Sequence, residues 1–300
     1  MASWTHSKEK LNNVTEFIFL GLSQNSEVKE VCFVVFSFFY MVILLGNFLI
    51  MLTVCHGNLF KMPMYFFLNF LSFVDICYSS VTVPKMIADL SQDKTISYEG
   101  CMLQLFGVHL FGCTENFILT IMAYNCYVAI CKPLHYVTIM DQERCNKLFL
   151  GTWLGGFIHS IIQVTLVVQL PFCSPNEIDH YFCDVHPMLK LACTGTYLVS
   201  IMVTANSRTI TLGTYIILLI SYTVILVSLQ KQSAEGRRKA LSTCGAHITV
   251  VIIFFGPCTF MYMRPDMTFS EDKMVAVFYT IITPMLNPLI YTLRNAEVKN

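Results

Sequence analysis

The chain has 300 residues, of which 55% are hydrophobic and only 13% are charged, and its formal net charge is zero. Soluble domains average about 25% charged residues, so this composition excludes an ordinary soluble protein. The zero net charge also gives no indication of a nucleic-acid partner.

A polar segment, residues 1–28, precedes the first apolar run. It lacks the continuous apolar core of a cleaved secretory signal, so we expect the first run to act as an uncleaved anchor. Within the polar segment, Asn13-Val14-Thr15 is a glycan acceptor triplet. The triplet matters only if this segment lies outside the cell.

Seven apolar runs follow, each long enough to cross a bilayer. The run from Val31 to Val54 has 24 residues and no Asp, Glu, Lys or Arg, and a bilayer core needs roughly 20 helical residues. Backbone amides in lipid must be paired within their own segment, so each run is predicted to be a helix. The predicted spans are 29–55, 63–89, 98–130, 145–169, 197–229, 238–262 and 273–291. We therefore predict an all-α, seven-transmembrane-helix bundle, a single membrane domain over residues 1–300 with a short cytoplasmic tail at 292–300.

Basic residues near the ends of the spans indicate the orientation. With the N-terminal segment outside the cell, ten of the 19 Lys and Arg residues fall on the cytoplasmic side and seven on the outer side. The cluster Arg237-Arg238-Lys239 carries most of this difference. We therefore favour an extracellular N-terminus.

One connecting segment, residues 171–196, is longer than the others, and a long loop over a compact bundle is usually functional. It contains Cys173, Cys183 and Cys193, and Cys101 lies at the outer end of the third span. Four cysteines on the oxidising side of the membrane allow three pairings, among which spacing alone does not choose.

Histidines offer little indication of a metal site. His180, Cys183 and Asp184 are close together in the long loop, but they suit copper or zinc only if Cys183 is a free thiolate. His109 and His247 each lie on an apolar span without partners at a zinc-like spacing, as a core histidine would. We predict neither a metal nor a cofactor.

Three ionisable residues lie within the spans, where a charge costs at least about 2.5 to 3.5 kcal/mol. Asp75 and Glu115 lie near the middle of the second and third spans. Facing carboxylates there would share a proton, hold a small cation, or form a neutral pair that pins two helices together. Arg208 is better explained by snorkelling, or by pairing with a loop carboxylate, than by ligand contact.

Several motifs accompany these spans. The inner end of the third span reads MAYNCYVAICKPLHY from Met122 to Tyr136, and the further stretches are Gly46-Asn47, Pro63 to Leu68, Lys239 to Cys244, and Pro284 to Tyr291. Pro257 and Pro288 are predicted to kink the sixth and seventh spans. Asn47, Asp75 and Asn287 would then form hydrogen bonds around the second kink.

Over nearly the whole chain these motifs closely resemble the olfactory receptors, a branch of the rhodopsin-like G-protein-coupled receptors, in their tetrapod form. The resemblance implies a plasma-membrane receptor, in the cilia of olfactory sensory neurons, that binds small volatile odorants among the helices. It also implies coupling to the olfactory stimulatory heterotrimeric G protein and adenylyl cyclase. It further implies disulfides between Cys101 and Cys183 and between Cys173 and Cys193.

The resemblance also assigns residues to sites. Ligand contacts would come from His109, Gly112, Cys113, Asn206, Ile210, Cys258, Tyr262 and Thr280, whose three- and four-residue spacing puts each set on one helix face. Activation and G-protein coupling would involve Asn125, Cys126, Tyr127, Tyr222, Asn287, Pro288 and Tyr291. Asn47, Asp75 and Glu115 would form a polar cluster within the membrane.

The chain departs from the family pattern at the inner end of the third span. Where the family has Asp-Arg-Tyr, this chain has Asn125-Cys126-Tyr127, and a thiol cannot replace a guanidinium with five donors. Within the receptor class, the alternative is therefore a receptor that binds ligand but signals poorly.

Two other classes fit less well. A transporter would fit seven spans and membrane carboxylates, but the sequence has no inverted repeat. An intramembrane enzyme would need a motif such as His-Glu-x-x-His or a nucleophile with a base at helical spacing, and neither is present.

Overall fold

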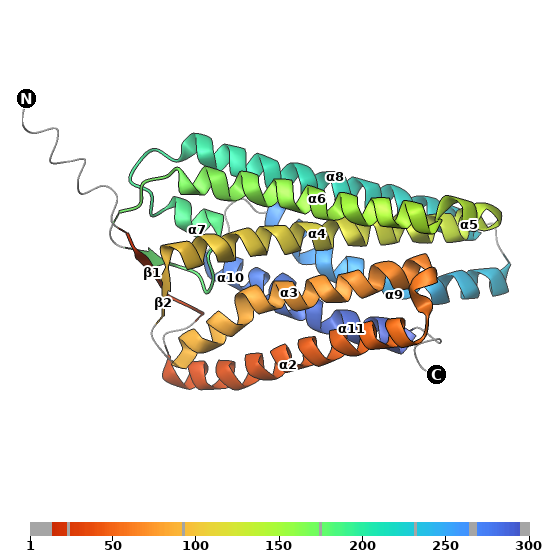
Figure 1. Cartoon of the computed structure of the whole chain (residues 1–300), viewed down its shortest axis with the longest axis horizontal. Coiled ribbons are helices and arrows are strands. Elements are labelled where there is room, and N and C mark those ends of the chain that lie inside the picture. Colours follow the sequence, from red (N-terminus) through yellow and green to blue (C-terminus); the bar gives the residue numbers. More distant parts are fainter. Residues whose placement is uncertain are drawn as a thin grey trace, which may run out of the picture.

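The computed structural model describes residues 14–22, 25–91, 94–173, 176–230, 233–263 and 269–294, without the side chains of 239–243, 257–263, 269–272 and 292–294. The predicted glycan site at Asn13 lies outside these residues. Long helices run side by side along the molecule (Figure 1). We call the end that carries the short strands the outer end, and the opposite end, near α5 (Tyr136–Ile139), the inner end.

The helices confirm the predicted seven-helix bundle. They are α2 (Ser26–His56), α3 (Pro63–Ser91), α4 (Tyr98–Cys131), α6 (Gln142–Val168), α8 (Tyr197–Gln230), α9 (Ala234–Met263) and a seventh helix built from α10 (Phe269–Val277), a π-helical turn η3 (Phe278–Ile282) and α11 (Thr283–Arg294). In the described part of the chain, six helices are long and apolar enough to cross a membrane. The remaining helix, α9, contains a shorter apolar segment, Cys244–Gly256.

Local sequence signals explain where several helices begin. The side chain of Asn25 accepts a hydrogen bond from the Glu27 amide at the start of α2, and Asp141 accepts one from the Arg144 amide at the start of α6. Such caps satisfy amide groups that have no partner within the helix. The second long helix, α3, begins at Pro63, whose missing N–H costs nothing in the first turn.

Short elements connect the helices. At the inner end these are the 3₁₀ turns η1 (Leu59–Lys61) and η2 (Pro133–His135), followed by α5. Asn58, just before η1, adopts a left-handed conformation with φ of 50°, which an asparagine tolerates better than most residues. At the outer end, α7 (Val185–Leu189) lies in the long loop.

A small sheet at the outer end was not predicted. Strand β1 (Glu16–Phe19) lies between β2 (Thr95–Ser97), which it meets antiparallel, and β3 (Glu177–Ile178), which it meets in parallel. Its residues Phe17 and Phe19 are buried in a cluster that includes Cys101 and Cys183. The N-terminal segment is therefore tied to two loops that are distant in sequence.

Helix α4 lies at the centre of the bundle and packs against α3, α6, α8 and α9. Glycines allow the close contact with α6. A Cβ at Gly155 would lie 2.7 Å from the Phe117 ring, and one at Gly156 would overlap the Thr114 hydroxyl. Small residues at helix contacts are the means by which membrane helices approach closely.

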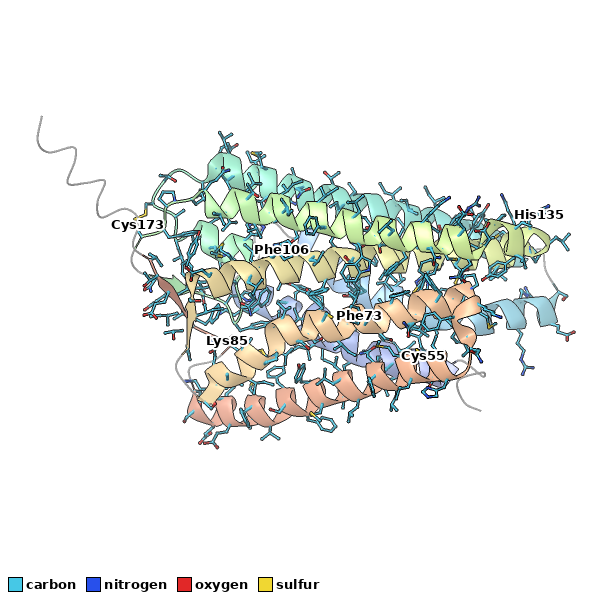
Figure 2. The ribbon with its side chains drawn as sticks, viewed as in Figure 1. Cys55, Phe73, Lys85, Phe106, His135 and Cys173 are labelled. Carbon is cyan, nitrogen blue, oxygen red and sulfur yellow. A yellow bond between two sulfur atoms is a disulfide. The ribbon has the colours of Figure 1, made fainter. Side chains whose placement is uncertain are left out.

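The outward faces of the helices are apolar, as lipid contact requires. Phe38 and Leu49 on α2 and Leu212 and Ile220 on α8 each have more than half of their surface exposed. Figure 2 shows the bundle with its side chains, with Cys173 at the outer end and His135 at the inner end. Exposed apolar bands of this extent belong against membrane lipid rather than water.

Candidate functional site

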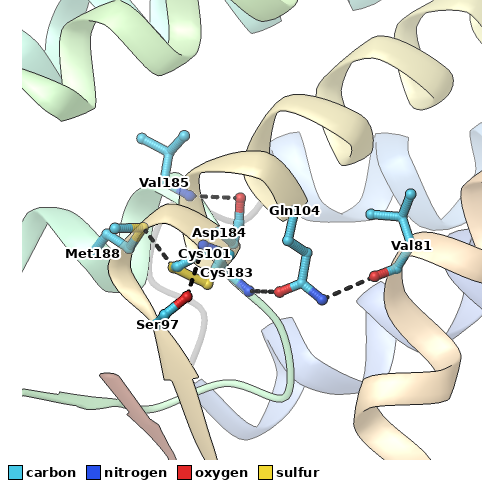
Figure 3. The surroundings of a disulfide bond; sticks show 9 residues. Val81, Ser97, Cys101, Gln104, Cys183, Asp184, Val185 and Met188 are labelled. Carbon is cyan, nitrogen blue, oxygen red and sulfur yellow. Dashed lines mark hydrogen bonds between the residues drawn. A yellow bond between two sulfur atoms is a disulfide. The ribbon is translucent and has the colours of Figure 1, made fainter. Parts of the chain in front are cut away.

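A covalently fixed loop covers the outer end of the bundle. One disulfide joins Cys101 on α4 to Cys183 in the loop, and a second joins Cys173 to Cys193 within the loop. Gln104 on α4 adds polar contacts. Its side-chain oxygen accepts from the amide of Cys183 at 2.9 Å, and its side-chain nitrogen donates to the carbonyl of Val81 at 2.9 Å (Figure 3). The loop is thus fixed against both α4 and α3.

Helix α7 forms part of this cover. The Asp184 carboxylate accepts a hydrogen bond from the amide of Val185 at 2.8 Å and so caps the helix. Figure 3 shows this contact beside the Cys101–Cys183 disulfide. Because Cys183 is in a disulfide, its sulfur is not available as a thiolate ligand for the metal considered from the sequence.

A cavity of about 250 Å³ lies beneath this loop. Its wall combines apolar and aromatic side chains with a few polar groups, as is usual for small-molecule sites. The residues that line it are Tyr78, Val108, His109, Gly112, Cys113, Asn116, His159, Phe182, Asp184, Val185, His186, Val203, Ser207, Ile210, Thr211, Phe254 and Tyr279.

Four of the expected ligand residues line this cavity. His109, Gly112 and Cys113 lie on α4, and Ile210 lies on α8. Asn206 is one layer further back, where its side-chain amide donates to Nδ1 of His159 at 3.1 Å. Two more expected contacts, Cys258 and Tyr262, belong to α9, but their side chains lie outside the described part of the structure.

Thr280, another expected contact, is not among the described residues that line the cavity. Its hydroxyl donates to the carbonyl of Ala276 at 2.8 Å and lies 3.1 Å from the hydroxyl of Tyr181, a residue of the long loop. The neighbouring Tyr279 lines the cavity instead. Because the single hydroxyl proton of Thr280 is donated to Ala276, the Tyr181 hydroxyl donates to Thr280.

Histidine 109 is also less isolated than its sequence context indicates. Its ring lies 5.4 Å from that of His159 on α6, centroid to centroid. His159 is a cavity residue that the sequence analysis missed, as are Asn116, Ser207 and Phe182. Asn116 had a usable signal, because it lies seven residues after His109 and therefore on the same face of α4. No spacing within the chain relates His159 to α4.

The intramembrane polar cluster lies deeper in the bundle. The side-chain amide of Asn287 donates to Asp75 at 2.8 Å. Asn47 donates instead to the carbonyls of Ile43 and Pro284, at 3.0 and 3.1 Å. Glu115 is buried close enough to Asp75 for the two groups to interact electrostatically. Within the described residues, no group of three or more potential ligands is placed to hold a metal ion.

Comparison with known proteins identifies the family. The olfactory receptor family model matches residues 36–300. The chain is 82% identical to human Olfactory receptor 4S2 over 97% of its own length and 94% of that protein's length. It is 59% identical to human Olfactory receptor 4B1, over 96% of the chain and 94% of that protein. It is 60% identical to mouse Olfactory receptor 4E2, over 95% of the chain and 93% of that protein. The chain belongs to the olfactory receptor family.

This olfactory receptor is therefore a G-protein-coupled receptor rather than an enzyme, and a multi-pass protein of the plasma membrane. Its departure from the family motif, Asn125-Cys126, lies at the inner end. Oδ1 of Asn125 accepts from the Tyr136 hydroxyl at 2.9 Å and so joins α4 to α5. Cys126 is buried in a small apolar cluster with Cys244 of α9, and the two thiols face each other.

Other residues assigned to activation also contact more than one helix or pack in the core. The Tyr222 hydroxyl lies 2.6 Å from Nδ1 of His247, which joins α8 to α9 and shows that His247 also has a partner. Tyr127 packs against the same cluster as Cys126. Tyr291 is 1% exposed in the inner core, and Pro288 lies within α11 against Gly46 of α2.

Arg208, the third ionisable residue noted within the spans, is exposed on α8. It is not among the described residues that line the cavity. This position fits the expected snorkelling of a long basic side chain along a lipid-facing surface.

Proposed function

We propose that this olfactory receptor binds a small volatile odorant in the cavity beneath the long loop. The observation that carries the proposal is the cavity itself, about 250 Å³ in volume and lined by residues of α3, α4, α6, α8, α9, the seventh helix and the loop. Its volume lies just below the roughly 300 to 1,000 Å³ of pockets for drug-sized ligands, which suits a smaller molecule.

The proposed contacts fall into two groups. His109, Gly112, Cys113 and Ile210 would touch the odorant, because they line the cavity. Asn206 and Thr280 would act indirectly, Asn206 by orienting His159 and Thr280 by holding Tyr181. Cys258 and Tyr262 remain proposed contacts on the strength of the family resemblance.

We further propose that ligand binding leads to coupling with a stimulatory heterotrimeric G protein of the olfactory type and with adenylyl cyclase. A route for this coupling runs along the seventh helix. Tyr279 lines the cavity, Ser79 donates to the carbonyl of Thr280, and Asn287 donates to Asp75 further in. A ligand that favours one arrangement of these contacts would shift the population of bundle shapes.

A second candidate function is a receptor that binds ligand but signals weakly. The inner end supports this alternative, because Cys126 occupies the position of the family arginine and is buried against Cys244. A thiol there cannot offer the forked donors of a guanidinium to a partner protein.

Two measurements test both candidates: cyclic AMP in cells, and thermal stabilisation of the receptor by ligand. Cells that carry the receptor and the olfactory G protein are exposed to an odorant panel, and cyclic AMP is measured beside surface expression. A response that rises with odorant concentration at normal surface level supports coupling. Ligand-induced thermal stabilisation without cyclic AMP supports the weakly signalling alternative. Neither effect with any odorant would contradict the proposed ligand site.

A further inference from the structure

Two side chains of the cavity wall carry polar atoms that lack a hydrogen-bond partner in the described part of the protein. These atoms are Oδ1 of Asn116 and Nε2 of His109, and both are fully buried. The Asn116 residue as a whole is 7% exposed. Leaving a buried polar group unpaired costs about 1 to 3 kcal/mol, so such groups generally have a partner. Because both residues line the cavity, a ligand is the natural source of that partner.

The two residues lie at different depths on one wall of the cavity. They are seven residues apart on α4, which is two turns of one face and about 10.5 Å along the helix axis. Between them lie Gly112 and Cys113, which present little bulk. A Cβ added at Gly112 would sit only 3.5 Å from the Tyr78 hydroxyl. Among the described residues, this part of the wall is thus made of small, uncharged side chains.

The charge of the cavity limits the ligand further. Among the described lining residues there is no Lys or Arg, and the single acid, Asp184, already accepts a hydrogen bond from Val185. A carboxylate ligand would lose its hydration without gaining a lysine or arginine partner from these residues, which is costly. A neutral ligand avoids that cost.

We propose that the ligands of this receptor are neutral, hydroxyl-bearing odorants, and that Asn116 is the residue that selects the hydroxyl. A hydroxyl both donates and accepts, so it can donate to Oδ1 of Asn116 and accept from the amide nitrogen of the same side chain. A second oxygen function about 10 Å away would bind the imidazole of His109. This inference rests on the proposed odorant site, whose ligand class it defines.

The test measures ligand-induced thermal stabilisation of the full chain purified in lipid nanodiscs, a readout that does not require a G protein. The probes have matched length: octanediol with a hydroxyl at each end, octanol, methyl heptyl ether, octanoic acid and octylamine. We expect the diol to act at lower concentration than octanol, and octanol at lower concentration than the ether. Each step should be roughly three- to tenfold, the effect of one hydrogen bond. The acid should be weakest, because the described lining offers it neither Lys nor Arg.

Substitutions assign the preference to residues. Asn116→Leu keeps the size but removes both polar groups, so octanol and the ether should then stabilise the protein at the same concentration. Asn116→Ser should restore part of the difference between them. His109→Phe should make the diol and octanol stabilise the protein at the same concentration, and it should leave the difference between octanol and the ether unchanged. Because each difference is measured within one variant, differences in yield or folding between variants do not affect it.

The inference is overturned if the ether matches octanol in the native chain, if the acid or the amine binds most tightly, or if Asn116→Leu leaves the difference between octanol and the ether unchanged. Stabilisation by other odorants in the absence of this ranking would overturn the inference alone. No stabilisation by any member of a broad odorant panel would instead overturn the proposed odorant site.

Discussion

The hydroxyl of Tyr181 in the long loop lies 3.1 Å from the hydroxyl of Thr280 on the seventh helix. The loop is also bonded covalently to α4 through Cys183. One short stretch of loop therefore contacts two helices that both contribute to the cavity wall. Any change in the separation of these helices must alter a contact with the loop.

Replacing Tyr181 with Phe should weaken this link without creating a large void. The lost hydrogen bond is worth about 1 kcal/mol, and Thr280 keeps its bond to the carbonyl of Ala276. We expect a lower thermal unfolding midpoint and a change in odorant potency at unchanged surface level. Tyr40→Phe, which removes a hydroxyl bonded to Ser80 away from the cavity, is the matched control. Equal effects of the two substitutions on potency would contradict a specific role for Tyr181.

Substituting Gly112→Leu should change the order of odorant potency according to ligand length. Leucine at this position would extend toward Tyr78 and shorten the cavity, so long odorants should lose more potency than short ones. Gly213→Leu is the control, because a Cβ at Gly213 on α8 meets no atom within 4 Å. Potency is measured by dose–response over a homologous odorant series. A uniform loss matched by lost surface expression would indicate helix packing at Gly112 instead.

Restoring the family motif should strengthen signalling. Asn125→Asp with Cys126→Arg would supply a guanidinium with charge-assisted hydrogen bonds of roughly 1.5 to 3 kcal/mol each, or about ten- to a hundredfold in an equilibrium. Arginine would also displace the close contact with Cys244. We expect more odorant-evoked cyclic AMP at equal surface level, with Cys126→Ser as the control that lacks the charge. An equally strong response from the native chain would show that Asn125-Cys126 is tolerated.

Acid should destabilise the outer end through His180. Burial lowers the pKa of this side chain to about 4, against opposing effects of Asp184 and Asp179 and a reinforcing effect of Lys273. Between about pH 6.5 and 4 the unfolded state therefore binds more protons than the folded state, so stability falls as pH decreases.

This loss should approach about 1.4 kcal/mol per pH unit. Substituting His180→Gln should flatten the dependence of the unfolding midpoint on pH within that window, whereas the exposed His135→Gln should not. If the unfolding midpoint depends on pH in the same way in the native chain and in His180→Gln, His180 is not the cause of the acid sensitivity.

Removing the two disulfides should have unequal effects. The Cys101–Cys183 bond spans 82 residues and the Cys173–Cys193 bond spans 20. Loop-closure entropy predicts losses of about 4.5 and about 3 kcal/mol, respectively. Double serine substitution of each pair, followed by surface labelling and thermal unfolding, measures the difference. A larger loss from the Cys173–Cys193 pair would mean that contacts of the loop, rather than chain entropy, dominate.

Hydropathy predicted the bundle because lipid forces each apolar run to pair its own backbone groups. It set the ends of the helices less well, since caps such as Asn25 and Asp141 extend α2 and α6 into polar sequence. The sheet escaped prediction because strands of two to four residues are too short to show an alternating pattern.

The cavity was predictable only along single helices. Helical spacing placed His109, Gly112 and Cys113 on one face of α4, as observed. Spacing could not place Thr280, which was the single residue expected from the seventh helix, and residues 278–282 form a π-helical turn whose faces do not follow the 3.6-residue period. The approach of His159 to His109 depends on how α6 packs against α4, which no spacing within the chain encodes.

The pairing of β1 also constrains the order in which the protein is assembled. The N-terminal segment is synthesised first, yet its parallel partner, β3, follows only after α2, α3, α4 and α6. Until residues 177–178 have been made, Phe17 and Phe19 have no complete site in which to be buried. The sheet at the outer end therefore forms late in biogenesis, through contacts between segments that are distant in sequence. A receptor whose synthesis stops before α8 already contains β1, β2 and β3, the three strands of this sheet.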